Sequence, residues 1–138
     1  MLVFVVFIQK FSIISGIHAP AQSCHKDAFW THLRNLNSVV GKPWCLIGDF
    51  NELEYPDDKQ GGAMVMPYRL TRLPCFLNSC QAITLPVLGR VFTWKKRIHG
   101  HIVYEKLDRA IGRHDWCDQY PNSRVSTCLL YTSPSPRD

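Results

Sequence analysis

The apolar positions near the start of the chain predict two strands followed by a helix. The runs Val3–Ile8 and Phe11–Ile17 are rich in β-branched residues, which favour buried strands. Between Asp27 and Val40, apolar side chains occur at the i, i+4, i+7 and i+11 spacing of one helical face. This spacing predicts an amphipathic helix that Ser23 or Asp27 can cap.

The segment after this helix predicts a central strand that ends in a polar loop. The residues 41–43 (Gly-Lys-Pro) stop the helix, and Trp44–Ile47 is a short apolar run that Gly48 closes. Such a run suits a strand that is buried on both faces. Further along, Met64–Ser79 predicts a second helix. Pro74 would be an interior proline there, which costs about 3 kcal/mol or kinks the helix.

Short apolar runs in the second half of the chain predict further strands. The predicted elements are strands at Ala82–Leu85, Val91–Lys95, Ile102–Leu107 and Arg124–Thr127, a hairpin turn at 98–101 and a helix at His114–Tyr120. This order of strands and helices predicts an α/β protein with a layered sheet and right-handed crossovers. The tail, residues 128–138, is rich in Pro and Ser and cannot continue a buried sheet. We therefore expect one domain at 1–127 and a disordered tail.

Composition and charge narrow the function classes. The chain has 138 residues, of which 46% are hydrophobic and 12% aromatic, and this excludes a disordered chain. Its 16 Lys and Arg exceed its 11 Asp and Glu, for a net charge of +5, and seven of the basic residues lie between Arg90 and Arg113. Such clustering favours a polyanionic partner such as nucleic acid. A solvated hairpin with ordinary surface charge is the alternative.

The cysteines and the apolar N-terminal run bear on the cellular compartment. The six cysteines form no CxxC pair and no regular framework, which favours reduced thiols in a nuclear or cytoplasmic protein. The run Leu2–Ile8 is too short to span a bilayer and lacks the basic flank of a signal peptide. We expect no membrane association, and a small secreted protein is the least favoured interpretation.

Asp49 and Asn51 directly follow the central strand. Both residue types bond their own backbone in loops, so they can be simple turn formers. If the chain stays extended, their side chains share one face and project together from the edge of the sheet. The loop past such a strand is where α/β folds place their chemistry. An acid and an amide in that place can hold a metal, orient a water or bond phosphate oxygens.

Six short motifs together resemble a known family. They are Gly16-Ile17-His18-Ala19, Trp30-Thr31-His32-Leu33, the segment from Pro43 to Glu52, Lys59-Gln60-Gly61-Gly62, Phe92-Thr93-Trp94 and Lys106-Leu107-Asp108-Arg109-Ala110. In this order and spacing they resemble the endonuclease/exonuclease/phosphatase (DNase I-like) superfamily, and specifically the endonuclease region of plant non-LTR (LINE-type) retrotransposons. The resemblance implies an α/β fold, a four-layer sandwich of two mixed sheets flanked by helices, here partial and incomplete at both ends.

The resemblance also implies a chemistry, that of a metal-dependent phosphodiesterase that nicks DNA. Mg²⁺ would neutralise charge on the scissile phosphate while a water attacks it. By motif, Asp49 would orient or deprotonate the water or assist the leaving oxygen, and Asn51 would bond a phosphate oxygen. Asp108 would partner a histidine further along the chain, with a salt bridge to a basic neighbour as its alternative. His18 stands where the family often has a tyrosine that contacts the phosphate, with a structural role as its alternative.

The expected partner is DNA, and a reverse transcriptase region is expected in the parent polyprotein. By motif and charge, the residues expected to contact DNA are Thr93, Trp94, Arg90, Lys95, Lys96 and Arg97. Contacts of the basic residues with phosphates would be independent of sequence and would weaken as salt rises.

Finally, the resemblance implies that parts of the family's catalytic group lie outside this chain. The family's metal-binding Glu precedes the matching segment, and its Ser-Asp-His motif follows that segment, so the metal ligands here stay unknown. The tail 128–138 resembles a translated sequencing-library adapter, and we expect it to be an artefact. We therefore expect a fragment with little or no activity. A catalytically dead nucleic-acid-binding remnant and a phosphatase of the same superfamily are the alternatives.

Overall fold

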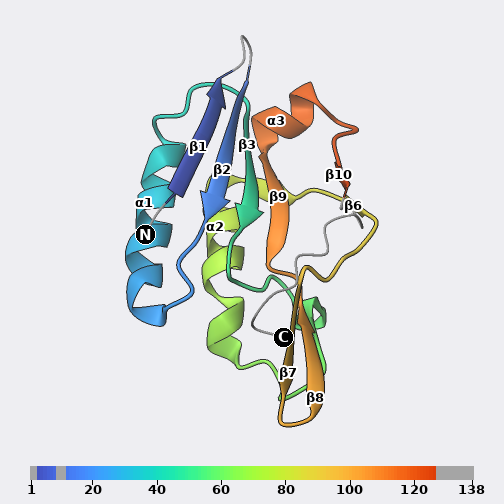
Figure 1. Ribbon diagram of the computed structural model, residues 1–138. Helices are drawn as coiled ribbons and strands as arrows, with labels where there is room; N and C mark the ends of the chain where they lie inside the picture. The colour runs from blue at the N-terminus through green and yellow to red at the C-terminus, as the bar shows by residue number, and fades with distance from the viewer. Residues whose placement is uncertain (1–2, 9–11, 127–138) are drawn as a thin grey trace.

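Figure 1 shows the computed structural model, which describes residues 3–8 and 12–126. The expectations for residues 128–138, and for the beginning of the strand predicted at Phe11–Ile17, lie outside the described residues. Within the described part, the chain forms one five-stranded sheet, two smaller sheets and three α-helices.

The five-stranded sheet is mixed. Its strands are β1 (Val3–Ile8), β2 (Ile13–His18), β3 (Trp44–Asp49), β9 (Asp108–Arg113) and β5 (Ala82–Thr84), and they lie side by side in that order. β2 and β3 run parallel and are joined through helix α1 (Ser23–Asn37), whereas all other neighbours in this sheet are antiparallel. The crossover therefore brings the carboxyl ends of β2 and β3 to the same edge of the sheet.

Two helices cover one face of this sheet, α1 and α2 (Arg72–Cys80) (Figure 1). Trp30 of α1 lies in the middle of this core, with its ring centroid 5.4 Å from that of Phe76 in α2 and 6.1 Å from that of Phe50 after β3. Leu46 and Ile111 meet these rings from the sheet and are fully buried. None of the helices in the described part of the chain is long and apolar enough to cross a membrane.

A smaller cluster lies on the opposite face of the sheet. It contains the buried residues Cys45, Leu85 and Ala110, against which α3 (His114–Gln119) and β10 (Val125–Ser126) pack. β10 pairs in parallel with β6 (Val87–Leu88). Cys45 and Leu46 thus serve opposite faces of β3, as expected for a strand buried on both sides. The predicted fold class, α/β with sheets flanked by helices, is confirmed; among the described residues only the five-stranded sheet is mixed.

The third sheet is an antiparallel hairpin with one short added strand. Its strands are β4 (Lys59–Gln60), β8 (His101–Glu105) and β7 (Trp94–Ile98), in that spatial order. Figure 1 shows the hairpin extending beyond the end of the main sheet. The turn predicted at 98–101 is confirmed, with His99 and Gly100 both at positive φ. The strand predicted at Val91–Lys95 begins only at Trp94, so that boundary was wrong.

The predicted helix boundaries also need correction. The first helix occupies Ser23–Asn37 instead of Asp27–Val40. Gln22 occupies the N-cap position and its side chain makes no capping bond, so the predicted cap by Ser23 or Asp27 was wrong. The second begins at Arg72, after two short 3₁₀ turns at Pro56–Asp58 and Pro67–Leu70. Pro74 consequently lies in the first turn of α2, where backbone N–H groups have no intrahelical partner. At this position proline removes no intrahelical hydrogen bond, so the cost expected for an interior proline does not apply.

β9 was missed by the sequence prediction, although it lies between β3 and β5 in the main sheet. Arg109 and Arg113 lie on the same face of β9 and are only 2% and 6% exposed. Arg113 donates to the carbonyl oxygens of Asn37, Val40 and Lys42 at 2.8–3.0 Å, and so binds the connection between α1 and β3. Its guanidinium also lies 5.5 Å from the centre of the Trp44 ring.

Candidate functional site

Three of the predicted site residues lie in one row across the main sheet. His18 at the end of β2 is paired with Asp49 at the end of β3, and Asp49 is paired with Asp108 at the start of β9. Side chains at directly paired positions point to the same face, with Cβ atoms about 4.5–5.5 Å apart in an antiparallel pair. His18 and Asp108 are exposed and Asp49 is half-buried. The fold therefore brings together three residues that are far apart in the sequence.

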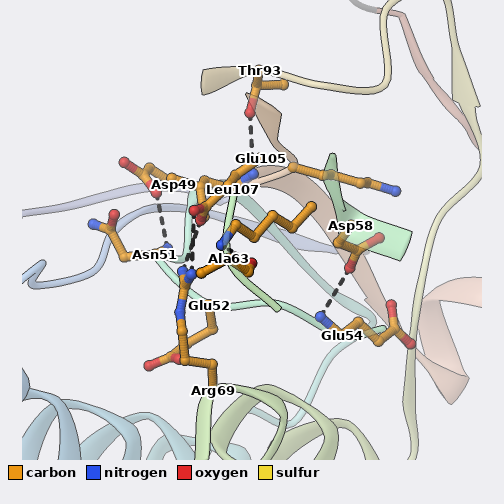
Figure 2. A network of polar contacts seen from close by, with 12 residues as sticks. Asp49, Asn51, Glu52, Glu54, Asp58, Ala63, Arg69, Thr93, Glu105 and Leu107 are labelled. Carbon is orange, nitrogen blue, oxygen red and sulfur yellow. Dashed lines mark hydrogen bonds and ion pairs between the residues drawn. The ribbon is translucent and has the colours of Figure 1, made fainter. Parts of the chain in front are cut away.

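Asn51 joins this row through a tight turn. Its φ is 50°, and its backbone N–H donates to Asp49 Oδ1 at 2.9 Å (Figure 2). Its Nδ2 donates to the carbonyl of Ala19 at 2.7 Å. Of the two conformations considered for residues 49–51, the chain adopts the turn and not the extended one, because the Asp49 carboxylate accepts the bond that closes the turn. Asn51 thus forms a turn and also lies next to Asp49. The turn-former interpretation and the site interpretation are therefore compatible.

Gly48 is required for the close approach of β2 and β3 at this point. Its φ is +146°, and a Cβ atom added here would lie 2.0 Å from the carbonyl oxygen of Ile17. A side chain at this position would push β3 away from β2 and move Asp49 out of register with His18. The pairing of β2 with β3 therefore requires glycine at position 48.

The carboxylates nearest to Asn51 in the sequence are engaged elsewhere. Glu52 forms ion pairs with Lys26 and Arg72. Glu54 accepts bonds from Thr84 and from Arg109. Its backbone N–H donates to Asp58 (Figure 2). Neither carboxylate is therefore directed into the row. Among the described residues, no group of three or more His, Cys, Asp and Glu side chains is placed to hold a metal ion. Asp49 and Asp108 are the two carboxylates of the row.

The segment around Asp108 is fixed by buried charges. Arg109 donates to Asp58 Oδ2 at 3.2 Å and to the Lys106 carbonyl at 2.9 Å, in addition to its bond with Glu54. In the described part of the chain, no salt bridge joins Asp108 to Lys106 or Arg109. Burial and the neighbouring Arg109 guanidinium lower the pKa of Lys106. The salt bridge with Arg109 that was the alternative role of Asp108 is thus made by Glu54 and Asp58.

Thr93 connects this segment to the hairpin. Its hydroxyl accepts the backbone N–H of Asp108 at 3.0 Å and that of Leu107 at 3.2 Å (Figure 2). Trp94 is half-buried at the start of β7, and the ring of Phe92 lies 6.0 Å from that of Tyr104. Thr93 therefore has a clear structural role beside the row.

The basic residues predicted to contact DNA lie in two places. Lys95, Lys96 and Arg97 are exposed along β7, where Lys95 and Arg97 share one face and Lys96 lies on the other. Arg90 instead lines a cavity of about 260 Å³ together with Asp108. Only Arg90 is thus adjacent to the row, and the other three extend from it along the hairpin.

Lys26 is a site residue that the sequence analysis missed. It lies on α1, is 8% exposed, and donates from Nζ to the carbonyl oxygen of Asn51 at 2.8 Å. A signal was present, because Lys26 precedes Trp30 and Leu33 at the i, i+4, i+7 spacing of the buried face. A lysine within such an apolar face is a candidate for a buried, partnered cation.

No protein-family model and no curated protein matches this sequence. Among solved structures, the chain is similar to the endonuclease domain of TRAS1, a telomere-specific non-LTR retrotransposon, with a TM-score of 0.61 and 16% identity over 85% of this chain and 52% of that one. The cytolethal distending toxins of Haemophilus ducreyi (TM-score 0.43, 15% identity, 80% of this chain and 37% of that one) and of Actinobacillus actinomycetemcomitans (0.44, 17%, 83% and 42%) are more distant. The chain thus spans about half the length of the endonuclease domain that it matches. At this identity the similarity concerns the fold: the chain has the α/β fold of a retrotransposon endonuclease domain.

Proposed function

We propose that this chain is part of a metal-dependent phosphodiesterase that nicks DNA, and that by itself it has little or no nicking activity. The observation that carries the proposal is the row of His18, Asp49 and Asp108, with Asn51 bonded beside it, on a fold shared with an endonuclease domain. A reverse transcriptase region in the parent polyprotein is part of the same proposal.

The donor set of the row suits Mg²⁺, which prefers carboxylate oxygens and is commonly bound through one or two carboxylates together with substrate phosphates. Asp49 and Asp108 would hold the ion. When bound, Mg²⁺ would supply charge neutralisation on the phosphate. Asp49 would orient or deprotonate the attacking water, and its bond from the Asn51 N–H fixes the carboxylate for that task. The Asn51 side chain would bond a phosphate oxygen, and His18 would donate a further hydrogen bond.

The low activity that we propose follows from the ion pairs of Glu52 and Glu54. Glu52 and Glu54 are committed to the cations Lys26 and Arg109, so they bring no further carboxylate to the row. Removing members of a cooperative catalytic group lowers rates by orders of magnitude.

The hairpin supports DNA as the partner. Lys95 and Arg97 project from one face of β7 and are exposed, which suits contacts with successive phosphates along a nucleic-acid backbone. A catalytically dead nucleic-acid-binding remnant remains a second candidate, because these residues lie apart from the row and act without it.

The experiment is a nicking and binding assay on purified chain with supercoiled plasmid and Mg²⁺. We expect DNA binding with little or no conversion to nicked circles. Nicking that Asp49→Ala abolishes would show that the chain is an active nuclease, and nicking that survives Asp49→Ala would indicate a contaminant. Binding with slow nicking that requires Asp49 supports the phosphodiesterase, and binding with no nicking at all supports the dead remnant. Phosphate release from a soluble phosphomonoester would favour a phosphatase. Absence of both binding and catalysis would contradict the proposal.

A further inference from the structure

Asn51 has a backbone conformation that L-amino acids seldom adopt. Its φ of 50° lies in the left-handed region, which asparagine tolerates better than most residues but which remains strained. Two bonds from its own donors oppose the strain, one to Asp49 Oδ1 and one to the Ala19 carbonyl. A third bond holds its carbonyl oxygen.

Lys26 supplies this third bond from helix α1. Its side chain is 10% exposed, and Nζ lies 2.8 Å from the Asn51 oxygen and 3.2 Å from Glu52 Oε2. Among the described residues, neither carboxylate oxygen of Glu52 accepts a hydrogen bond. The ammonium group therefore directs its hydrogen bond to the Asn51 carbonyl and has Glu52 as its counter-charge. A lysine whose sole task was to neutralise Glu52 would bond the carboxylate instead.

Glu52 accounts for the charge of this buried lysine. The Glu52 side chain is 1% exposed, and Arg72 Nη1 approaches the same Oε2 atom at 3.7 Å. A buried cation is unfavourable unless an opposite charge lies nearby. The bond from the Lys26 ammonium to the carbonyl of Asn51 is charge-assisted, and such bonds are roughly twice as strong as neutral ones.

The geometry points to Lys26 as a positioning residue: through the Asn51 carbonyl it holds the left-handed turn that sets Asn51 beside Asp49. The role in the turn is independent of any substrate. Its meaning for phosphodiester chemistry rests on the proposed function, in which Asn51 bonds a phosphate oxygen.

NMR on the full 138-residue chain tests the inference. Glu52→Gln removes the carboxylate charge but keeps the lysine, whereas Lys26→Met/Glu52→Gln also removes the donor and leaves neither charge of the pair behind. We expect three-bond couplings to report a positive φ at Asn51 in the parent chain and in Glu52→Gln, and a negative or averaged φ in the double variant. Hydrogen exchange of the Asn51 amide should rise on the order of tenfold in the double variant.

Two results would overturn the inference. One is a positive φ with slow exchange in the double variant, which would show that the turn holds without Lys26. The other is release of the turn in Glu52→Gln alone, which would assign the effect to the ion pair and not to the bond with Asn51.

Glycine at position 51 provides a second test that needs no assigned spectrum. Glycine adopts positive φ without steric cost, so the turn at position 51 in Asn51→Gly depends less on the bond from Lys26. We expect Lys26→Met/Glu52→Gln to lower the thermal midpoint less in the Asn51→Gly background than in the parent background. An equal or greater loss would show that Lys26 supports the fold in general, and the inference would be wrong. Neither test uses DNA or Mg²⁺, so failure of nicking and failure of positioning are distinguished.

Discussion

Asp49 and Asp108 stand directly opposite each other on the antiparallel strands β3 and β9. Like charges at such positions repel, so Asp108→Asn should raise the free energy of unfolding by about 0.5 kcal/mol at low ionic strength, and added salt should reduce the gain. Urea unfolding measures both effects, with Asp57→Asn as an exposed control. Millimolar Mg²⁺ should stabilise the parent chain more than Asp108→Asn. A loss of stability in Asp108→Asn without Mg²⁺ would contradict the repulsion.

Gly48 should be intolerant of any side chain. Gly48→Ala places a Cβ 2.0 Å from the Ile17 carbonyl at a φ of +146°, and we expect it to destabilise the protein by about 3 kcal/mol or more. Gly41→Ala is the control, because nothing lies within 4 Å of its added Cβ. Chemical denaturation of both variants is the measurement. Equal midpoints would show that β2 and β3 separate without cost.

Arg109 should be a major contributor to stability. Its side chain is 0% exposed and pairs with Glu54 and Asp58, so Arg109→Met would leave two largely buried carboxylates without their cation. We expect a loss of about 3–5 kcal/mol by equilibrium unfolding. Arg97→Met, at an exposed position of β7, should change stability little. A mild effect of Arg109→Met would show that water reaches the two acids.

These arginines also explain which parts of the fold could be predicted from the sequence. Phe29 and Leu33 mark the buried face of α1 by their spacing, and the run that ends at Ile47 marks the central strand, because burial there is apolar. β9 buries the charged Arg109 and Arg113 beside the apolar Ala110 and Ile111. In the sequence these arginines resemble surface cations, and the strand was missed. The boundaries of the helices depend on tertiary contacts such as those of Arg113, which local patterns do not contain.

The site was predictable in composition but not in geometry. Asp49 and Asp108 are identifiable by motif, and their common row follows from strand pairing that only the fold establishes. The conformation of Asn51 depends on its bonds to Asp49, to Ala19 and to Lys26, two of which lie far away in the sequence. The sequence alone therefore left open whether residues 49–51 form a turn or stay extended.

The two faces of the β7–β8 hairpin should differ in nucleic-acid binding. Lys96 shares its face with Val103 and Glu105, which approach Gly62 and Arg69, whereas Lys95 and Arg97 lie on the other face. If both contact phosphates, Lys95→Ala/Arg97→Ala should reduce the slope of log binding constant against log salt by about 1.8, at ~0.9 per phosphate. Lys96→Ala should change the slope less. Fluorescence anisotropy with duplex DNA measures this, and equal effects would contradict the assignment of faces.

Cys45 should resist modification well into the alkaline range. Burial, with a further contribution from Cys117, raises the pKa of the Cys45 thiol from 9.0 to about 12. Because the folded pKa is the higher one, the associated stability is complete below the unfolded pKa and is lost as the pH rises from about 9 towards 12. At pH 8.5 a thiol reagent should label the exposed Cys24 and Cys75 in folded protein but not Cys45. Rapid labelling of Cys45 under those conditions would show that the sheet opens.

The hydrogen bonds of Arg113 to the backbone after α1 have a practical consequence for engineering. Residues 38–42 are surface positions that one would ordinarily choose for a tag, a fluorophore loop or new chain termini. Arg113, however, donates to the carbonyl groups of Val40 and Lys42 in this segment, so lengthening the connection would detach a buried guanidinium. The tip of the hairpin at His99 and Gly100 is exposed, and space surrounds Gly100. Inserted sequence belongs there, far from the strand ends that align His18 with Asp49.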